Sequence, residues 1–189
     1  MNRNNTREKW LDAGLRVLAA DGASGLRIDR IAARLKLSKG SFHHHFSGAD
    51  GYKRELLAHF EAMAVDAMER EIDAARAPGD ARAVLTRLTG LVSAGGEGLY
   101  RPQLEVAVRA WATWDDEVNR VQGRIDRARL TALQRIWRPH VATDADARVA
   151  ALLPYLVALG AAVSVPPVEP EELGRVYETL LPLVPGPHA

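Results

Sequence analysis

The chain has 189 residues, 47% of them hydrophobic, which is enough for one large or two small domains with a sizeable core. It contains no cysteine, so disulfides, thiolate metal sites and thiol-based redox sensing are excluded. The net charge is only +1, yet residues 1–56 carry eleven Lys and Arg against six Asp and Glu, a local basic excess that suits a phosphate-facing module.

The first predicted helix begins at Thr6, as its N-cap, and runs to about Ala20, before the break at Asp21-Gly22. Its inner side combines large apolar residues with small ones at points where helices must approach closely. This set is Trp10, Leu11, Ala13, Gly14, Val17 and Leu18. We therefore expect this helix to pack closely against a neighbouring helix.

Residues 28–46, which read IDRIAARLKLSKGSFHHHF, contain two short helical patterns separated by a tight polar turn. The first pattern places its apolar residues on one face, at helical spacing. Ser38 is a good N-cap for the second helix, which we expect to reach about His45. This second helix has little to bury except two phenylalanines, and its other side chains are donors or are small. Such a face suits a major groove, where base edges offer hydrogen-bonding groups and phosphates flank them.

The side chains of this second helix are the candidates for DNA contact. We expect Lys39 and Gly40, at its start, to approach base edges or phosphates, and Ser41, His43 and His44 are the next candidates.

Two other interpretations of the same helix are weaker. Phe42 and Phe46 could stack on bases, but we assign them to the core. The histidines at 43, 44 and 45 could suggest a metal site, but adjacent residues on a helix point about 100° apart and cannot converge on one ion. We expect neither a metal nor a cofactor.

The segment from Thr6 to about Leu57, above all IAARLKLSKGSFHHHF followed by a new helix, resembles the N-terminal DNA-binding domain of the tetracycline-repressor (TetR) family. The matching positions are Ile31-Ala32, Ser38-Lys39-Gly40-Ser41-Phe42 and His45-Phe46. Members of that family are all-helical, homodimeric bacterial transcription regulators, commonly repressors that small ligands release. The resemblance implies the same fold and a double-stranded DNA operator as partner.

The resemblance also implies roles for individual residues. His45 matches a position that often faces the DNA backbone, and Thr6 and Arg27 are candidates to bind phosphate from neighbouring helix ends. The sequence departs from the usual family pattern at four positions. These are Arg27 in place of a capping Thr, Lys36 in place of Gly, and His43 and Ala49 in place of a phosphate-contacting Tyr and Lys.

The rest of the pattern predicts six further helices, about nine in all, and an all-α fold. Their expected ranges are 49–76, 80–93 with Asp80 as N-cap, 102–113, Asp115 or Asp116 to Trp137, 144–163 with Asp144 as N-cap and a kink at Pro154, and 169–183 with Pro170 in the first turn. We expect a helix-turn-helix DNA-binding domain over 1–48 and a helical ligand-binding and dimerisation domain over 49–189, with the helix from about 49 joining them.

The helix over 144–163 is apolar almost all round, so it needs packing partners on every side. A two-fold four-helix bundle made with the last helix would supply them, although these residues could instead form the core of a monomer. The expected dimer interface is Leu152, Leu156, Leu159, Gly160, Val163, Val176, Tyr177 and Leu180. Two DNA-reading heads on a two-fold axis could then bind two half-sites of a near-palindromic operator.

A small-molecule effector is expected in the second domain, where aromatic side chains and a few polar anchors suit a mostly apolar pocket. The candidate ligand-binding residues are His59, Tyr100, Arg109, Trp111, Trp114, Trp137 and Tyr155. The alternative is that each tryptophan packs in the core and that Arg109 pairs with Glu105, four residues earlier.

Other classes of protein find less support. There is no Gly-rich phosphate loop, nucleophile elbow or helix-borne histidine pair with metal spacing, so we do not expect an enzyme. No apolar run approaches eighteen residues and the first ten residues are polar, so we expect a soluble cytoplasmic protein without a membrane partner. Two alternatives to a regulator stay open: a helical small-molecule binder that has lost specific DNA binding, and a protein-interaction module.

Overall fold

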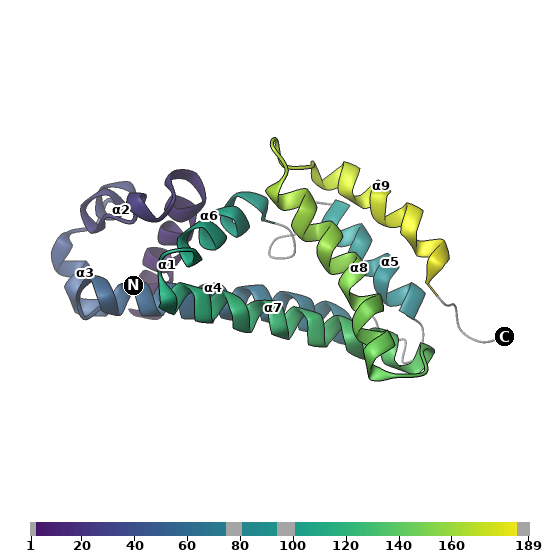
Figure 1. Ribbon diagram of the computed structural model, residues 1–189. Coiled ribbons are helices and arrows are strands. Elements are labelled where there is room, and N and C mark those ends of the chain that lie inside the picture. The colour runs from purple at the N-terminus through teal and green to yellow at the C-terminus, as the bar shows by residue number, and fades with distance from the viewer. Residues whose placement is uncertain (1–2, 75–80, 94–100, 185–189) are drawn as a thin grey trace. The chain divides into compact units, whose positions relative to one another are not determined.

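The computed structural model describes residues 3–74, 81–93 and 101–184, and that part of the chain is built from helices without a β-strand (Figure 1). The helices are α1 (Arg3–Asp21), η1 (Ala23–Gly25), α2 (Ile28–Leu35), α3 (Lys39–His45), α4 (Gly48–Ala74), α5 (Ala81–Ser93), α6 (Pro102–Ala112), α7 (Asp116–Trp137), η2 (Arg138–His140), α8 (Asp144–Val163), α9 (Pro170–Leu180) and η3 (Leu181–Leu183). The all-α class and the nine predicted α-helices are confirmed for this part of the chain.

The backbone forms two compact units. The first contains residues 1–62 and 103–123, and the second contains residues 63–102 and 124–189. Helices α4 and α7 therefore contribute residues to both units. The boundary expected at residue 48 separates a DNA-binding domain from a ligand-binding and dimerisation domain. It does not rest on compactness, and it stays a prediction.

The first unit is held together by a cluster of four aromatic rings, three from α1, α3 and α4 and one from Phe46, the residue that follows α3. Trp10 and Phe42 have no exposed surface, and Phe46 and Tyr52 are also buried. The ring centroids of Trp10 and Phe42 lie 5.3 Å apart, and those of Phe46 and Tyr52 lie 4.9 Å apart, both in edge-on arrangements. The Tyr52 hydroxyl donates a 2.7 Å hydrogen bond to the carbonyl oxygen of Trp10, and burial raises the pKa of this hydroxyl.

Gly14 allows α1 to pack directly on α4. A Cβ atom at this position would collide with the Tyr52 hydroxyl, so no other residue fits without moving that ring. The predicted inner side of α1 is buried as expected. Arg7 and Glu55 form an ion pair between α1 and α4, and His59 Nε2 lies 2.9 Å from an Asp12 carboxylate oxygen.

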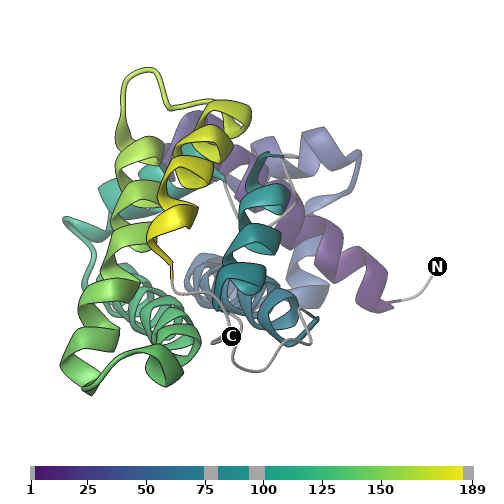
Figure 2. The same ribbon diagram turned by 90° about the vertical axis from the view of Figure 1, so that its right-hand side faces the viewer.

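The second unit has a separate apolar core, to which α5, α7 and α8 contribute. Leu85, Leu133, Trp137 and Ala151 are buried there. Figure 2 shows α5, α8 and α9 grouped together, with α9 packed on α5. Arg82, in α5, donates a 2.7 Å hydrogen bond to the carbonyl oxygen of Val184. This bond ties the segment that follows α9 to α5.

Two predicted helix caps are wrong. Helix α1 begins at Arg3, so Thr6 lies inside the helix and is not its N-cap. Helix α8 does begin at Asp144, but its N-cap is Thr143, whose hydroxyl accepts from the Asp146 amide at 3.1 Å while the Asp146 carboxylate accepts from the Thr143 amide. This reciprocal pair satisfies two backbone donors, which Asp144 could not do. The last helix ends at Leu180, before η3, and the predicted cap Asp80 lies outside the described residues.

Helix α8 is long and apolar enough to cross a membrane by length and composition alone, a property that core helices of soluble proteins share. Its buried residues are the small ones, Ala147, Ala151, Ala161 and Ala162. Its large residues are more exposed: Val149 is 69% exposed and Leu156 is 55% exposed.

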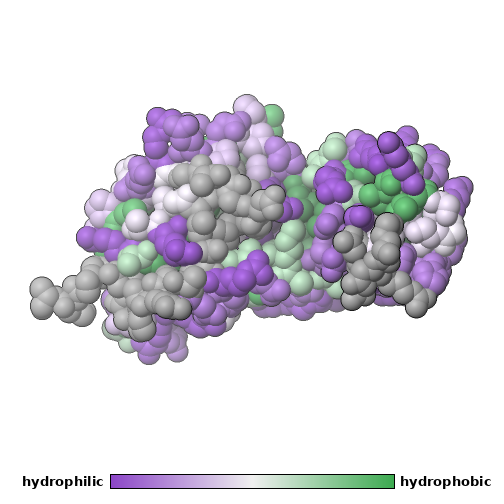
Figure 3. All heavy atoms as spheres, turned by 180° about the vertical axis from the view of Figure 1, so that it is seen from behind, coloured by the Kyte–Doolittle hydropathy of each residue, from purple (hydrophilic) through white to green (hydrophobic). Residues whose placement is uncertain are grey.

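Another face of the molecule, seen in Figure 3, is mostly hydrophilic, with apolar side chains in smaller areas.

Candidate nucleic-acid interface

Helices α2 and α3 form the predicted helix-turn-helix. Between them Lys36 adopts a left-handed backbone conformation with φ of 54°, which explains why glycine is favoured at this position of the turn. Ser38 caps α3 as predicted, and its hydroxyl oxygen accepts from the Ser41 amide at 3.2 Å. Helix α3 is anchored by Phe42, which confirms that this ring belongs to the core.

Helix α3 lies at an edge of the first unit (Figure 1). Lys39, Gly40, His43 and His44 are exposed, whereas Ser41 and His45 are half-buried. The exposed set carries one fixed positive charge and two imidazoles, with no carboxylate. This face can therefore donate hydrogen bonds to base edges and phosphate oxygens without electrostatic repulsion from the helix itself.

The other two predicted DNA contacts lie on different helices. Thr6 is only 8% exposed, so most of its surface is already covered by the protein. Arg27 occupies the N-cap position of α2 without a side-chain cap, and its guanidinium pairs with the Asp29 carboxylate at 3.2 Å. The hydrogen bond from Arg27 holds the pKa of Asp29 below its usual value. A phosphate at this point would have to share Arg27 with that carboxylate.

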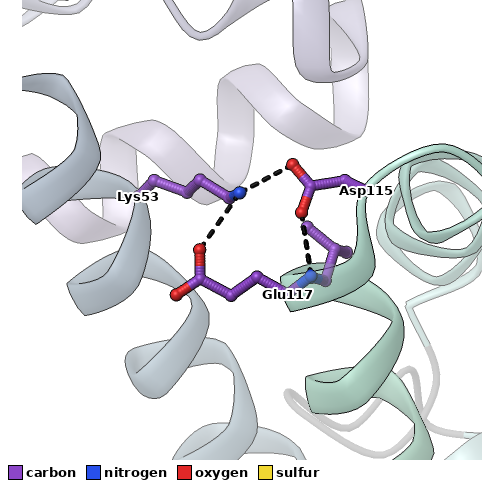
Figure 4. A network of polar contacts seen from close by, with 4 residues as sticks. Lys53, Asp115 and Glu117 are labelled. Atoms are coloured by element: carbon purple, nitrogen blue, oxygen red, sulfur yellow. Dashed lines mark hydrogen bonds and ion pairs between the residues drawn. The ribbon is translucent and has the colours of Figure 1, made fainter.

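A charged cluster fixes the first part of α4 to the corner between α6 and α7 (Figure 4). The Lys53 ammonium contacts the Asp115 carboxylate at 2.6 Å and the Glu117 carboxylate at 3.1 Å, and it lies 5.7 Å from the centre of the Trp111 ring. Asp115 also accepts from the backbone amides of Glu117 and Val118, at the start of α7. One lysine thus pairs with two carboxylates at the start of α7, one of which, Asp115, caps the helix.

The pKa values of this cluster reflect its ion pairs. Burial alone lowers the pKa of Lys53, but the hydrogen bonds to Asp115 and Glu117 outweigh burial, so the pKa lies above its ordinary value. Burial alone raises the pKa of Asp115, but the hydrogen bond from Lys53 and the backbone amides outweigh it, so this pKa is lowered. Both groups are therefore held in their charged forms at neutral pH.

The residues expected to bind a ligand fall into three groups. His59, Arg109, Trp111 and Trp114 belong to the first unit, Trp137 and Tyr155 belong to the second, and Tyr100 lies outside the described residues. Their assignment to a ligand stays a prediction.

Several of these side chains already have structural roles. Arg109 pairs with Glu105 at 2.7 Å, the alternative that the four-residue spacing offered. Trp137 is buried in the core of the second unit, and Tyr155 packs against that core. Trp114, by contrast, is 69% exposed, although its ring lies 6.3 Å from that of Trp111.

The residues expected at a dimer interface are at least partly accessible. Leu156, Gly160, Val163 and Val176 are exposed, whereas Leu152, Leu159, Tyr177 and Leu180 are half-buried. The Tyr177 hydroxyl donates to the Pro154 carbonyl oxygen at 2.8 Å, which ties α9 to α8.

The sequence interpretation missed two features. It named Asp115 only as a possible helix start and did not connect it with Lys53, because no local motif joins residues that lie 62 positions apart in the chain. It also left Val149 and Leu153 out of the expected interface, although both are exposed on α8. Residues 149, 153 and 156 share one face of the helix by helical spacing, but α8 is apolar almost all round, so the spacing alone did not show which face stays exposed.

Comparison with known proteins agrees with this arrangement. The sequence pattern described as "Bacterial regulatory proteins, tetR family" matches residues 11–59, which include both helices of the helix-turn-helix. The comparison with curated proteins finds no match.

Solved structures resemble nearly the whole chain. The reduced form of NemR from E. coli has a TM-score of 0.75 at 16% identity, covering 97% of this chain and 100% of its own. A transcriptional regulator from Rhodococcus sp. Rha1 has a TM-score of 0.71 at 19% identity, covering 94% and 95%. A Saccharomonospora viridis protein whose crystal structure holds choline has a TM-score of 0.69 at 21% identity, covering 95% and 96%.

At these identities the solved structures show the fold, while the match over 11–59 concerns the DNA-reading helices themselves. The chain combines that helix-turn-helix with the all-helical fold of transcription regulators. Residues 11–59 thus match the pattern of the tetR family of bacterial regulatory proteins, and the chain has the fold of solved transcription regulators.

Proposed function

We propose that this protein is a DNA-binding transcription regulator of the TetR family, a cytoplasmic homodimeric repressor that binds a near-palindromic operator through α3 and is released by a small-molecule effector. The observation that carries the proposal is the exposed, carboxylate-free face of α3, which is anchored by the buried Phe42 ring. Two such helices on a two-fold axis would reach successive major grooves, about 34–36 Å apart.

The surface of α8 supports the homodimer. This helix turns its alanines inward and leaves Val149, Leu153 and Leu156 exposed, the reverse of what a helix on the surface of a monomer needs. Gly160 is exposed on the same helix, and a Cβ atom there would have no neighbour within 4 Å. A second copy of α8 and α9 would cover these side chains, and the glycine would allow the helices to approach closely.

An effector is supported more indirectly. One structural relative holds choline, and the present chain offers aromatic residues in both units, among them Trp111, Trp114 and Tyr155. No catalytic function is proposed for the chain.

The experiment that tests the proposal is a selection of genomic DNA fragments by the purified protein at two salt concentrations. We expect a near-palindromic site whose affinity falls steeply as salt rises, because lysine and arginine contacts with phosphate release counterions. Recovery of no specific site from protein that is folded and dimeric would instead favour a ligand binder or a protein-interaction module.

A charge reversal then assigns binding to α3. Lys39→Glu places a carboxylate on the DNA-facing helix, and we expect operator affinity to fall by about 100-fold or more while the dimer persists. Arg120→Glu changes the net charge by the same amount at an exposed position of α7 and should leave affinity within about threefold. Full operator binding by Lys39→Glu would contradict the proposed role of α3.

A further inference from the structure

Gly40 occupies a position at which the protein itself does not require glycine. A Cβ atom built there would meet only the Ser38 Oγ, at 3.6 Å, which is an ordinary van der Waals distance. Its backbone also lies outside the positive-φ region that favours glycine. Gly14 differs in this respect, because a Cβ atom there would collide with Tyr52.

Glycine is also a poor helix former, second only to proline, and α3 has just seven residues. A glycine therefore weakens this short helix, and close packing within the protein does not require it there. Gly40 is exposed, and it lies three and four residues before His43 and His44, which place their side chains on the same face. Beyond its two chain neighbours, the only side chain within 4 Å of a Cβ atom built at Gly40 is that of Ser38. Another molecule can therefore come close to the helix backbone at Gly40.

The side chains around Gly40 suit one kind of base edge. A lysine ammonium only donates hydrogen bonds, and an imidazole has at least one N–H donor in every protonation state. In the major groove guanine presents two acceptors, N7 and O6, whereas adenine is best matched by Asn or Gln and cytosine by a carboxylate. Helix α3, with the sequence KGSFHHH, contains neither an amide side chain nor a carboxylate.

From this geometry we infer that Gly40 marks the point of closest approach between α3 and the operator, and that Lys39, His43 and His44 read guanine there. The inference rests on the proposed function, since it names the bases that the DNA-binding helix selects. The missing side chain at residue 40 would then serve the selection of bases rather than the folding of the helix.

The first test identifies the bases. Selection from a pool of randomised duplexes should recover half-sites with at least one invariant guanine on one strand. Replacing that guanine by 7-deazaguanine removes the N7 acceptor and should weaken wild-type binding by about tenfold. The same replacement should weaken Lys39→Ala or a His43→Ala, His44→Ala double variant much less, because the donor is already absent. Half-sites without guanine, or full affinity for the 7-deazaguanine duplex, would overturn the guanine assignment.

The second test separates folding from recognition. Gly40→Ala should unfold at the same temperature as the wild type or a higher one, because alanine favours the helix and the Cβ fits. Its operator affinity should nevertheless fall by about tenfold, since the methyl group would occupy the space that the base edge needs. Gly90→Ala is the matched control, because Gly90 is an exposed glycine in α5 with nothing within 4 Å of a built Cβ.

Each result bears on one statement. Wild-type affinity in a folded Gly40→Ala variant would overturn the close approach. A wild-type protein that selects no DNA site at all would overturn the proposed function, whereas a selected site that tolerates both changes would overturn only the present inference.

Discussion

Helices α3 and α8 expose opposite kinds of surface. Helix α3 buries its largest ring, Phe42, and exposes donors, whereas α8 buries alanines and exposes Val149, Leu153 and Leu156. In α3 the apolar side chain is fully buried within the protein, and the exposed polar face can contact a polar partner. In α8 the apolar packing is incomplete without another apolar surface. The same fold thus presents one polar surface at the proposed DNA contact and one apolar surface at the proposed contact with a second copy.

The largest effect should follow from removing the anchor of α3. Phe42→Ala deletes a fully buried ring that contacts Trp10, Phe46 and Tyr52, and should destabilise the first unit by about 3–5 kcal/mol. Urea unfolding followed by circular dichroism would measure this loss. Phe42→Leu keeps most of the apolar volume and should cost clearly less. Equal unfolding midpoints for wild type and Phe42→Ala would show that α3 is not anchored as described.

The face of α8 gives the next prediction. Leu156→Glu places a carboxylate in the proposed apolar interface, and should raise the dimer dissociation constant by about 100-fold, measured by analytical ultracentrifugation. Operator affinity should fall with it, because each monomer then binds one half-site alone. Leu183→Glu makes the same substitution at a 70% exposed leucine of η3, outside the proposed interface, and should leave the dimer intact. An unchanged dimer in the Leu156→Glu variant would place the interface elsewhere.

These two helices also show what local sequence can predict. The bounds of α2 and α3 follow from short-range signals, namely the apolar spacing, the Ser38 cap and the turn at Lys36, and the structure confirms them. The buried side of α1 was predictable for the same reason. Caps were less secure, since Thr143 and Asp144 are adjacent residues that can both cap, and only the reciprocal bond with Asp146 decides between them.

Contacts that depend on the tertiary fold could not be predicted in this way. The sequence of α8 is apolar almost all round, so its periodicity could not say which side faces inward; packing against the rest of its unit selects the alanines. The Lys53 cluster joins residues 62 positions apart and has no local signature. The ligand-binding residues stay predictions, because a tryptophan that fills a core and one that lines a pocket have the same sequence signal.

The Lys53 cluster is charged, as the exposed face of α3 is, but its charged groups pair with one another within the protein. Lys53→Met keeps the apolar stem but removes the charge, and should cost about 1 kcal/mol at pH 7, since the pair with Asp115 is only partly buried. Arg54→Met, at an exposed neighbour on α4, should cost less. Chemical unfolding of the three proteins across pH would measure both differences.

The pKa shifts determine how this difference depends on pH. The pKa of Asp115 is lowered, so its contribution is present above about pH 4 and is lost as the pH falls through the folded value. The pKa of Lys53 is raised, so its contribution is present below about pH 10 and is lost as the pH rises further. The difference between wild type and Lys53→Met should therefore be constant near neutrality and shrink at both extremes. A difference that persists unchanged at pH 3 would mean that the Lys53 ammonium stabilises the first unit through its contact with the Trp111 ring rather than through its carboxylate partners.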